Sequence, residues 1–331
     1  METKILGLHH VTAFASDPQT NVDFYTQILG LRLVKKTVNF DDPHTYHLYF
    51  GDDIGRPGTL ITFFPWTKNG LRGRKGVNQI SAFAYSIPDA SVGFWLERLR
   101  SFGIEVRGPM YRFDEEVVTF ADPDGFEVEL VASPNDLRST WNSREVPARH
   151  SLRGFHSVTL RESSPEKTGE FLTSSLGFQL HGESGDRTRF HVAHGSPGAL
   201  VDLVRDPMGK RGSMGIGVIH HVAWRAPTNE SQLAIRATLD DDGADVTPVV
   251  DRSYFQSIYF HEPGGVLFEI ATDPPGFLTD ETYDQLGGSL RLPKWLEQYR
   301  SDIEGTLPAI IPHHVEIISA PATIPTLDEK R

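Results

Sequence analysis

Four segments of the chain share one outline, and this fourfold repeat constrains the fold more than any other feature of the sequence. Each segment contains an apolar strand, an amphipathic helix that ends near a glycine, and then several further strands. The first strands centre on Val11, Phe83, Val158 and Val222. The repeat predicts an α+β protein built from four βαβββ modules that form two open β-barrels.

The helix of each module is predicted from apolar residues at helical spacing, followed by a glycine. Glycine readily takes the left-handed conformation that ends a helix. The helices are predicted over residues 22–29, 92–102, 171–176 and 231–239, before Gly30, Gly103, Gly177 and Gly243.

The modules are predicted to group into two domains, residues 1–150 with modules 1 and 2 and residues 151–331 with modules 3 and 4. The chain has 331 residues, which is the length of two average domains. The polar stretch 133–153 is predicted as the linker. About 55 proline-rich residues at the end are expected to form a C-terminal extension that wraps the second half.

Composition excludes several classes of function. The 32 lysines and arginines against 44 acidic residues give a formal charge of −12, which disfavours nucleic acids and anionic membranes as partners. The chain has no cysteine, so disulfides, thiolate metal ligands and cysteine nucleophiles are excluded. No signal peptide or membrane-spanning stretch is visible, so we expect a soluble cytoplasmic protein. A homo-oligomer is compatible with the sequence.

Two equivalent positions of the modules carry metal-ligating residue types. The position in the first strand holds His10, Ala82, Ser157 and His221. The position in the last strand, four residues after its leading glycine, holds Thr62, Glu129, Asp202 and Glu269. Two imidazoles and one carboxylate form the ligand set of non-haem Fe(II) oxygenases. Because only modules 1 and 4 carry these histidines, we predict that those two modules come together.

Each histidine belongs to a pair of adjacent residues, His9 with His10 and His220 with His221. Adjacent residues of a strand point to opposite faces, so both members of a pair can bind one metal only if the strand is distorted. Alternation alone leaves open which member faces the metal. Glu269 lies in an apolar strand, where an unpaired carboxylate would be costly, and this favours its assignment as a ligand.

Over about residues 5–277 the chain resembles the ring-cleaving dioxygenases of the vicinal oxygen chelate superfamily, in the branch that acts on hydroquinones. The resemblance implies the vicinal oxygen chelate fold with two glyoxalase-like domains. It is carried by the motifs Leu8-His9-His10-Val11-Thr12, Tyr46-His47-Leu48-Tyr49-Phe50, Gly58-Thr59-Leu60, His220-His221-Val222-Ala223 and Pro263-Gly264-Gly265-Val266-Leu267-Phe268-Glu269.

The resemblance also implies the ligands and the reaction. The metal ligands would be His10, His221 and Glu269, binding Fe(II) or, in some members, Mn(II). The expected activity is extradiol-type ring cleavage of a hydroquinone or catechol by O2, and the expected partners are therefore a small aromatic substrate and dioxygen. The family's residues around the metal map onto this chain as follows: His9, Thr12, His220, Arg252 and Tyr259.

The resemblance suggests roles for these surrounding residues. His9, His220 and Tyr259 would transfer protons, and Arg252 would hold an anionic oxygen of the substrate. Without the resemblance, Arg252 and Tyr259 would be interpreted as residues of the sheet surface.

Two alternative functions are compatible with the same sequence. A glyoxalase-like lyase or isomerase would use Zn(II) or Ni(II) without dioxygen, and it would normally need a carboxylate where this chain has Thr62. A protein that sequesters an aromatic compound without catalysis would need no set of two histidines and a glutamate, so the presence of that set argues against it.

Other signals are interpreted as structural. His313 and His314 repeat the histidine pair, but no module follows them, so we expect them to pack within the C-terminal extension. Glu129 and Asp202 are expected to make structural hydrogen bonds. The glycines at 212, 215 and 217 precede a strand instead of joining a strand to a helix, which is the wrong context for a dinucleotide site.

Overall fold

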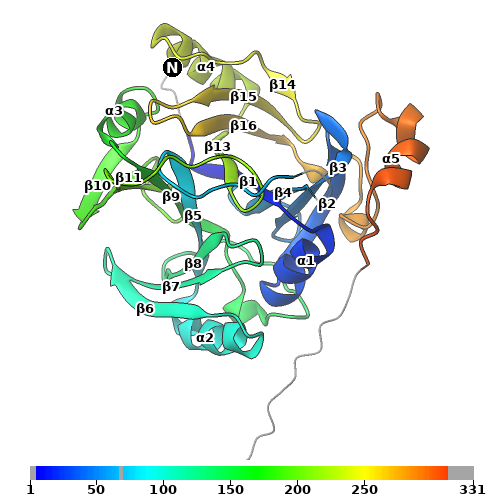
Figure 1. Cartoon of the computed structure of the whole chain (residues 1–331), viewed down its shortest axis with the longest axis horizontal. Coiled ribbons are helices and arrows are strands. Elements are labelled where there is room, and N and C mark those ends of the chain that lie inside the picture. Colours follow the sequence, from blue (N-terminus) through cyan, green and yellow to red (C-terminus); the bar gives the residue numbers. More distant parts are fainter. Residues whose placement is uncertain (1–4, 67–69, 312–331) are drawn as a thin grey trace, which may run out of the picture.

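The computed structural model describes residues 5–66 and 70–311, which contain two curled eight-stranded sheets (Figure 1). The first sheet has the order β14-β15-β16-β13-β1-β4-β3-β2. Its strands are β1 (Leu8–Ala15), β2 (Arg32–Asn39), β3 (Asp42–Gly51), β4 (Leu60–Pro65), β13 (Ile219–Ala226), β14 (Val250–Asp251), β15 (Phe255–His261) and β16 (Leu267–Pro275).

The second sheet has the order β10-β11-β12-β9-β5-β8-β7-β6. Its strands are β5 (Gln79–Ile87), β6 (Val106–Arg112), β7 (Glu115–Ala121), β8 (Glu127–Ala132), β9 (Phe155–Glu162), β10 (Gln179–Ser184), β11 (Arg187–His191) and β12 (Leu200–Arg205). The predicted α+β fold of four βαβββ modules in two open barrels is therefore confirmed.

The first sheet joins module 1 to module 4, and the second joins module 2 to module 3. Strand β1 runs antiparallel to β13 with Val11 opposite Val222, and β5 runs antiparallel to β9 with Phe83 opposite Val158. The prediction that modules 1 and 4 meet is confirmed. Each half of the chain contributes one module to each barrel, while the division into domains at residue 150 stays a prediction.

One helix crosses each module, as predicted. The α-helices are α1 (Pro18–Asp23), α2 (Val92–Ser101), α3 (Glu166–Ser174), α4 (Asn229–Asp241) and α5 (Arg300–Thr306). Helix α1 continues into a π-helical turn over Phe24–Ile28. The short 3-10 helices are Asp89–Ser91, Ala148–His150, Phe277–Thr279, Tyr283–Gln285 and Glu297–Tyr299.

The four predicted stop glycines all have left-handed backbones. Their φ angles are +71° at Gly30, +72° at Gly103, +72° at Gly177 and +80° at Gly243. An added Cβ would be strained at such angles, so glycine ends each helix at the predicted place. Within residues 5–66 and 70–311, no helix is long and apolar enough to span a membrane.

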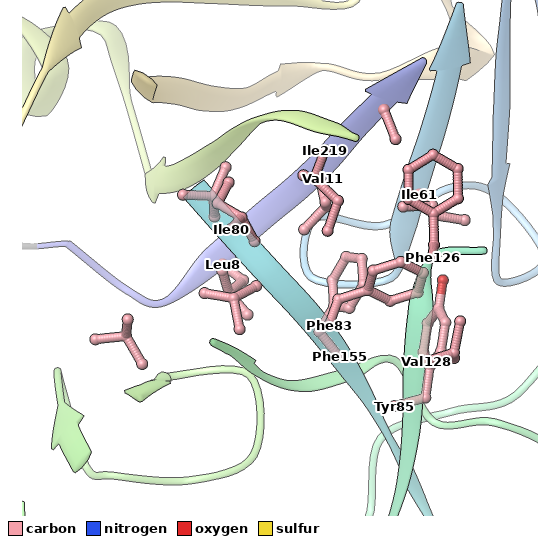
Figure 2. Close-up of a cluster of buried hydrophobic side chains, with 14 of the residues drawn as sticks. Leu8, Val11, Ile61, Ile80, Phe83, Tyr85, Phe126, Val128, Phe155 and Ile219 are labelled. Atoms are coloured by element: carbon pink, nitrogen blue, oxygen red, sulfur yellow. The ribbon is translucent and has the colours of Figure 1, made fainter. Parts of the chain in front are cut away.

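The largest hydrophobic cluster lies where the central strands of the two barrels meet. Figure 2 shows Val11, Ile61 and Ile219 of the first sheet beside Phe83 and Tyr85 of the second. All five side chains are buried. Because side chains alternate along a strand, packing Val11 against the second barrel turns its neighbours His10 and Thr12 toward the interior of the first barrel.

The described part of the C-terminal extension, up to residue 311, packs on module 1 as well as on module 4, and for these residues the expectation that it wraps the second half is wrong. Its residues Leu296 and Ile303 form a buried cluster with Val38 of β2, and helix α5 lies beside β3 in Figure 1. Its carboxylates Asp280 and Glu281 bind the buried ammonium of Lys35 in β2. A buried cation and an apolar strand face both need partners, and the extension supplies them.

Candidate metal centre

Three predicted ligands meet inside the first barrel. Nε2 of His221 lies 2.9 Å from Oε2 of Glu269, and Nε2 of His10 lies 3.3 Å from the same oxygen. The two Nε2 atoms are 3.3 Å apart. All three residues are buried. The structure therefore brings together one residue from each of β1, β13 and β16, as the comparison of the modules predicted.

A bulge in each central strand explains how both members of a histidine pair lie near one centre. Along β1 and β13, Leu8 is opposite Trp224 and His10 is opposite Ala223, so His9 has no partner of its own. A second shift leaves His220 unpaired in the same way. Bulges turn side chains away from regular alternation and are common beside active sites. The distortion that the alternation rule requires is thus present at both pairs.

The protonation of the first pair follows from what each ring nitrogen faces. Burial and the neighbouring His10 lower the pKa of His9 well below its usual value, so its ring is neutral. Nε2 of His9 lies 3.2 Å from the carbonyl oxygen of Thr272 and must donate to it. Nδ1 of His9 then accepts from Nδ1 of His10 at 2.9 Å. Nε2 of His10 is left with a lone pair that faces Glu269.

The second pair repeats the arrangement with one difference. Nδ1 of His221 lies 2.9 Å from Nδ1 of His220. Burial and the neighbouring His221 lower the pKa of His220 to about 3, and burial also lowers the pKa of His221. If His221 donates from Nδ1, Nε2 of His220 carries a hydrogen. His220 lines the cavity beside the three ligands, so this hydrogen is available to a molecule bound there.

Glu269 is held on one side and has no donor on the other. Its Oε1 accepts from the hydroxyl of Ser257 at 2.5 Å, whereas its buried Oε2 has no hydrogen-bond donor. Burial alone would raise the pKa of Glu269, but positive charge beside its Oε2, carried by His10 and His221 when no cation is bound, holds that pKa well below its usual range. An ionised, buried oxygen without a donor is costly unless a cation is bound to it.

The three ligand atoms fit a divalent metal ion. Ligand atoms at right angles on an ion with bonds of about 2.1 Å lie about 3.0 Å apart. The three observed separations are 2.9, 3.3 and 3.3 Å. Two neutral imidazoles and one carboxylate on one side of an ion leave other positions open for substrate and dioxygen. Thr62 occupies the position in module 1 that is equivalent to Glu269 in module 4. Its hydroxyl bonds to other side chains, so it does not add a fourth ligand.

Thr62 belongs to a chain of polar side chains that leads into the cavity. Its Oγ1 lies 2.9 Å from Oγ1 of Thr12 and 2.9 Å from Nε2 of His47. The hydroxyl of Tyr49 lies 2.9 Å from Nδ1 of the same imidazole. Burial, then the charges of His10 and Arg252, lower the pKa of His47 well below its usual value. A hydrogen donated by Tyr49 orients His47 to donate to Thr62, which in turn can donate to Thr12.

His47 is a site residue that the sequence interpretation did not select. It lines the same cavity as His10 and His221 although it lies 37 positions after His10 in the chain. The signal for it was available in the motif Tyr46-His47-Leu48-Tyr49-Phe50, where His47 and Tyr49 share one face of β3. What placed that face inside the barrel was the register of β3 against β4, with Tyr49 opposite Thr62.

Arg252 and Tyr259 also lie at the cavity, as the resemblance implied. Nε of Arg252 donates to the hydroxyl oxygen of Tyr259 at 3.0 Å, and its NH1 lies 3.3 Å from Oδ2 of Asp41. Burial, followed by the charge of Glu269, raises the pKa of Tyr259 above its usual value. Tyr259 therefore keeps its hydrogen at neutral pH and is a donor beside the metal site.

The cavity in front of the ligands has a volume of about 440 Å³ and mostly aromatic walls. Phe14 stacks on Trp66 with ring centroids 4.1 Å apart, and Phe64 lies 4.2 Å from the ring of His47. Asp41 and Arg252 also line the cavity, and the exposed side chain of Asp41 marks its mouth. A planar aromatic molecule fits walls of this kind, with its polar groups directed at the metal ligands or at the mouth.

The second barrel has no such centre among the described residues. Glu129, at the position equivalent to Glu269, pairs with Arg112 at 2.7 Å. Asp202 is bound by both Arg187 and Arg189. The expectation that both acids are structural is confirmed, since arginines neutralise them. His313 and His314 lie outside the described residues.

Comparisons with known proteins show which family the chain resembles over most of its length. A model of the Glyoxalase/Bleomycin resistance protein/Dioxygenase superfamily matches residues 7–130 and 154–270. MhqO of Bacillus subtilis, named as a candidate ring-cleaving dioxygenase, is 46% identical over 93% of this chain and 98% of its own. The chlorohydroquinone/hydroquinone 1,2-dioxygenase of Sphingobium indicum is 34% identical over 92% of this chain and 96% of its own. A crystal structure of a candidate Bacillus subtilis dioxygenase superposes with a TM-score of 0.90, at 44% identity over 94% of this chain and 99% of its own.

Proposed function

Because the chain belongs to the Glyoxalase/Bleomycin resistance protein/Dioxygenase superfamily, we propose that it is an Fe(II)-dependent dioxygenase that cleaves the ring of a hydroquinone, next to a hydroxyl-bearing carbon. The observation that carries the proposal is the set of three buried ligand atoms of His10, His221 and Glu269 at the end of an aromatic cavity. Relatives that match nearly the whole chain, one named as a candidate ring-cleaving dioxygenase and one as a hydroquinone 1,2-dioxygenase, support the choice of reaction.

The proposed metal supplies a binding site for a phenolic oxygen, whose pKa it lowers, together with activation of dioxygen. In hydroquinone the two hydroxyls are para to each other, so only one of them can reach the ligands of a single site. The other hydroxyl then points toward the mouth of the cavity. Arg252 and Asp41 lie there, and both can form hydrogen bonds with it.

The residues around the ligands would move and hold protons. Tyr259 donates a hydrogen bond to an oxygen of the substrate, and Arg252 fixes the Tyr259 hydroxyl from behind at 3.0 Å. His220 presents its Nε2 hydrogen to the cavity, and the chain from His47 through Thr62 to Thr12 can deliver or accept a proton on the other side. Such positioned acids and bases typically contribute about 10²–10⁴-fold to a rate.

His9 would take a smaller part than the sequence suggested. Its Nε2 hydrogen is bound by the carbonyl oxygen of Thr272, and His9 does not belong to the lining of the cavity. We assign it to holding His10 in the tautomer that leaves Nε2 free for metal.

The proposal is tested by loading the protein with Fe(II) without air and then supplying a hydroquinone and ¹⁸O2. The expected result is oxygen uptake with hydroquinone and a ring-opened product that contains both labelled atoms. Fe(II) and Mn(II) are compared in parallel, because the ligand set suits both.

Parallel assays with other metals and substrates separate the alternatives. Turnover of a hemithioacetal with Zn(II) or Ni(II), without oxygen uptake, would indicate a glyoxalase-like enzyme and refute the proposal. Binding of hydroquinone to the Fe(II)-loaded protein with no oxygen uptake would indicate a protein that only sequesters aromatic compounds.

A further inference from the structure

The mouth of the metal cavity is formed by the tip of the hairpin between β2 and β3. Asn39, Phe40 and Asp41 of this tip line the cavity together with Arg252 from the other half of the barrel. The tip also has contacts on its outer side. There the ring of Phe40 meets the ring of Trp295, with centroids 5.6 Å apart and an angle of 78° between the planes. Phe40 thus touches both the cavity and the C-terminal extension.

The ion pair across the mouth is too weak to hold the tip by itself. Asp41 approaches Arg252 at 3.3 Å, but its side chain is 76% exposed. Water and salt screen a pair of this kind, so it contributes little to the position of either residue. The Asp41 amide also bonds to Oδ1 of Asn39 at 3.0 Å, which shapes the turn but does not attach it to the rest of the molecule.

The C-terminal extension provides the attachment that the tip lacks. Next to Trp295, the side chains of Leu296 and Ile303 bury Val38 on the outer face of β2. Further along β3, Nδ1 of His44 bonds to the hydroxyl of Thr306 at 2.8 Å, and the hydroxyl of Tyr46 donates to the carbonyl oxygen of Pro308 at 3.0 Å. Both sides of the hairpin are therefore held by the extension.

The extension is itself firmly anchored to both halves of the barrel. The ammonium of Lys35 is completely buried against Asp280 and Glu281. Oδ2 of the same Asp280 accepts from the hydroxyl of Tyr254 at 3.0 Å, and Tyr254 lies two residues after Arg252. A buried charge keeps its partners because losing them leaves it uncompensated, so the support behind Phe40 has a fixed position.

We propose that the C-terminal extension determines which substituents the cavity admits, because Trp295 packs behind Phe40 and fixes the width of the mouth. Phe40 and Trp295 are specificity-determining residues in this account, whereas Asp41 would only hydrogen-bond the second hydroxyl that all hydroquinones share. The inference rests on the proposed function for its ligand class, which is a hydroquinone with a substituent on the ring.

The test measures binding without turnover. The metal-loaded protein is titrated without oxygen with hydroquinone and with tert-butylhydroquinone, and the ratio of the two dissociation constants is compared among variants. Trp295→Ala should let Phe40 move outward and shift the ratio toward the bulky ligand by about tenfold, with metal content unchanged. Trp295→Phe, which keeps an aromatic edge behind Phe40, should restore the ratio.

A matched control comes from the same segment. Tyr299 is 54% exposed and Trp295 is 51% exposed, yet no ring contact joins Tyr299 to the hairpin within the described residues. Tyr299→Ala should leave the ratio as in the unmodified protein. Phe40→Leu makes the side chain at the mouth smaller and leaves the residues of the extension unchanged. It should therefore shift the ratio in the same direction as Trp295→Ala. Asp41→Asn should weaken both ligands equally.

The outcomes separate this inference from the proposed function. An unchanged ratio in Trp295→Ala and Phe40→Leu, or an equal shift in Tyr299→Ala, would overturn the inference alone. A shifted ratio in a protein that consumes no oxygen with any hydroquinone would overturn the proposed function and leave the inference standing. Binding of neither ligand to the unmodified protein would overturn both.

Discussion

At the scale of single residues, the two histidine pairs have the same inner geometry and different outer ends. Nδ1 of each ligand bonds to Nδ1 of its neighbour at 2.9 Å. His9 then ends on the carbonyl oxygen of Thr272, whereas His220 ends at the cavity. The family resemblance implied the same proton-transfer role for both neighbours. Their different roles arise from contacts that only the folded barrel supplies.

This difference predicts different losses in two equivalent variants. His9→Asn should weaken metal binding by about 10–100-fold, because the partner that orients His10 is lost, while fully loaded protein keeps its turnover number. His220→Asn should weaken metal binding similarly and also lower the turnover number of the loaded protein. Metal titration and oxygen uptake on the same samples measure both effects. Equal turnover numbers in the two loaded variants would remove the proposed catalytic role of His220.

Tyr259 provides a second test at this scale. Tyr259→Phe keeps the ring and removes the hydroxyl, so we expect full metal content and a turnover number lower by about 10²-fold. Tyr85→Phe, at a buried tyrosine of β5 in the second sheet, is the matched control and should keep the full turnover number. Full activity of Tyr259→Phe would leave the metal site in place and refute the acid–base role.

At the scale of elements, the repeat predicted the positions of the ligands but not the bulges that shape them. In the second barrel the pairing of β5 with β9 leaves Ser81 and His156 unpaired, at the positions equivalent to His9 and His220. All four modules therefore carry the same bulge. Pairing register depends on two distant strands, so local alternation could not locate it. For the same reason His47, whose place depends on β3 and β4, was not selected.

A buried carboxyl pair joins helix α3 of module 3 to the turn before β16 of module 4. The hydroxyl of Thr168 lies 2.8 Å from Oε2 of Glu162 and 2.6 Å from Oε2 of Glu262. The hydroxyl of Thr168 has one hydrogen and can donate it to only one of the two carboxyl groups. The other carboxyl group must therefore be protonated and donate its own hydrogen to the Thr168 oxygen. Glu262 also accepts from the amides of Gly264 and Val266, whereas Oε1 of Glu162 has no hydrogen-bond partner among the described residues. Glu162 is then protonated, in agreement with a pKa raised to about 7 by burial and by Glu262.

The pair makes stability depend on pH. The pKa of Glu162 is higher in the folded protein than in the unfolded chain, so protonation of Glu162 stabilises the fold. This stabilisation is complete below about pH 4.5, amounts to about 3 kcal/mol, and is lost as the pH rises through about 7. Glu162→Gln imitates the protonated form, so its free energy of unfolding should match the unmodified protein at pH 5 and exceed it at pH 8. Glu170→Gln, on the exposed face of the same helix, is the control. Equal values for Glu162→Gln and the unmodified protein at pH 8 would contradict this assignment.

At the scale of the whole molecule, the two halves of the chain are interleaved. The pairing of module 1 with module 4 could be predicted from the ligands, since only those modules carry His10 and His221. The docking of the C-terminal extension on β2 could not be predicted, because it depends on a buried Lys35 whose partners Asp280 and Glu281 are about 245 residues away. Proline content indicated an extension but not its destination.

Interleaving predicts the behaviour of the separated halves. Residues 1–150 alone would leave β1 without β13 and β5 without β9, so both central edges and the core between the barrels would be exposed. Neither half should bind metal when produced alone, and the two produced together should recover binding. Metal content after size-exclusion chromatography measures this. Tight metal binding by residues 1–150 alone would contradict the pairing of the modules.

The most direct test of the central claim is the iron content of four variants after loading with Fe(II) in the absence of air. Glu269→Gln is compared with Glu129→Gln, which makes the same change at the equivalent position of the second barrel, and His10→Ala and His221→Ala complete the set. We predict about one iron per chain in the unmodified protein and in Glu129→Gln, and almost none, with no oxygen uptake, in the other three. Full iron content in Glu269→Gln, or its loss in Glu129→Gln, would contradict the account.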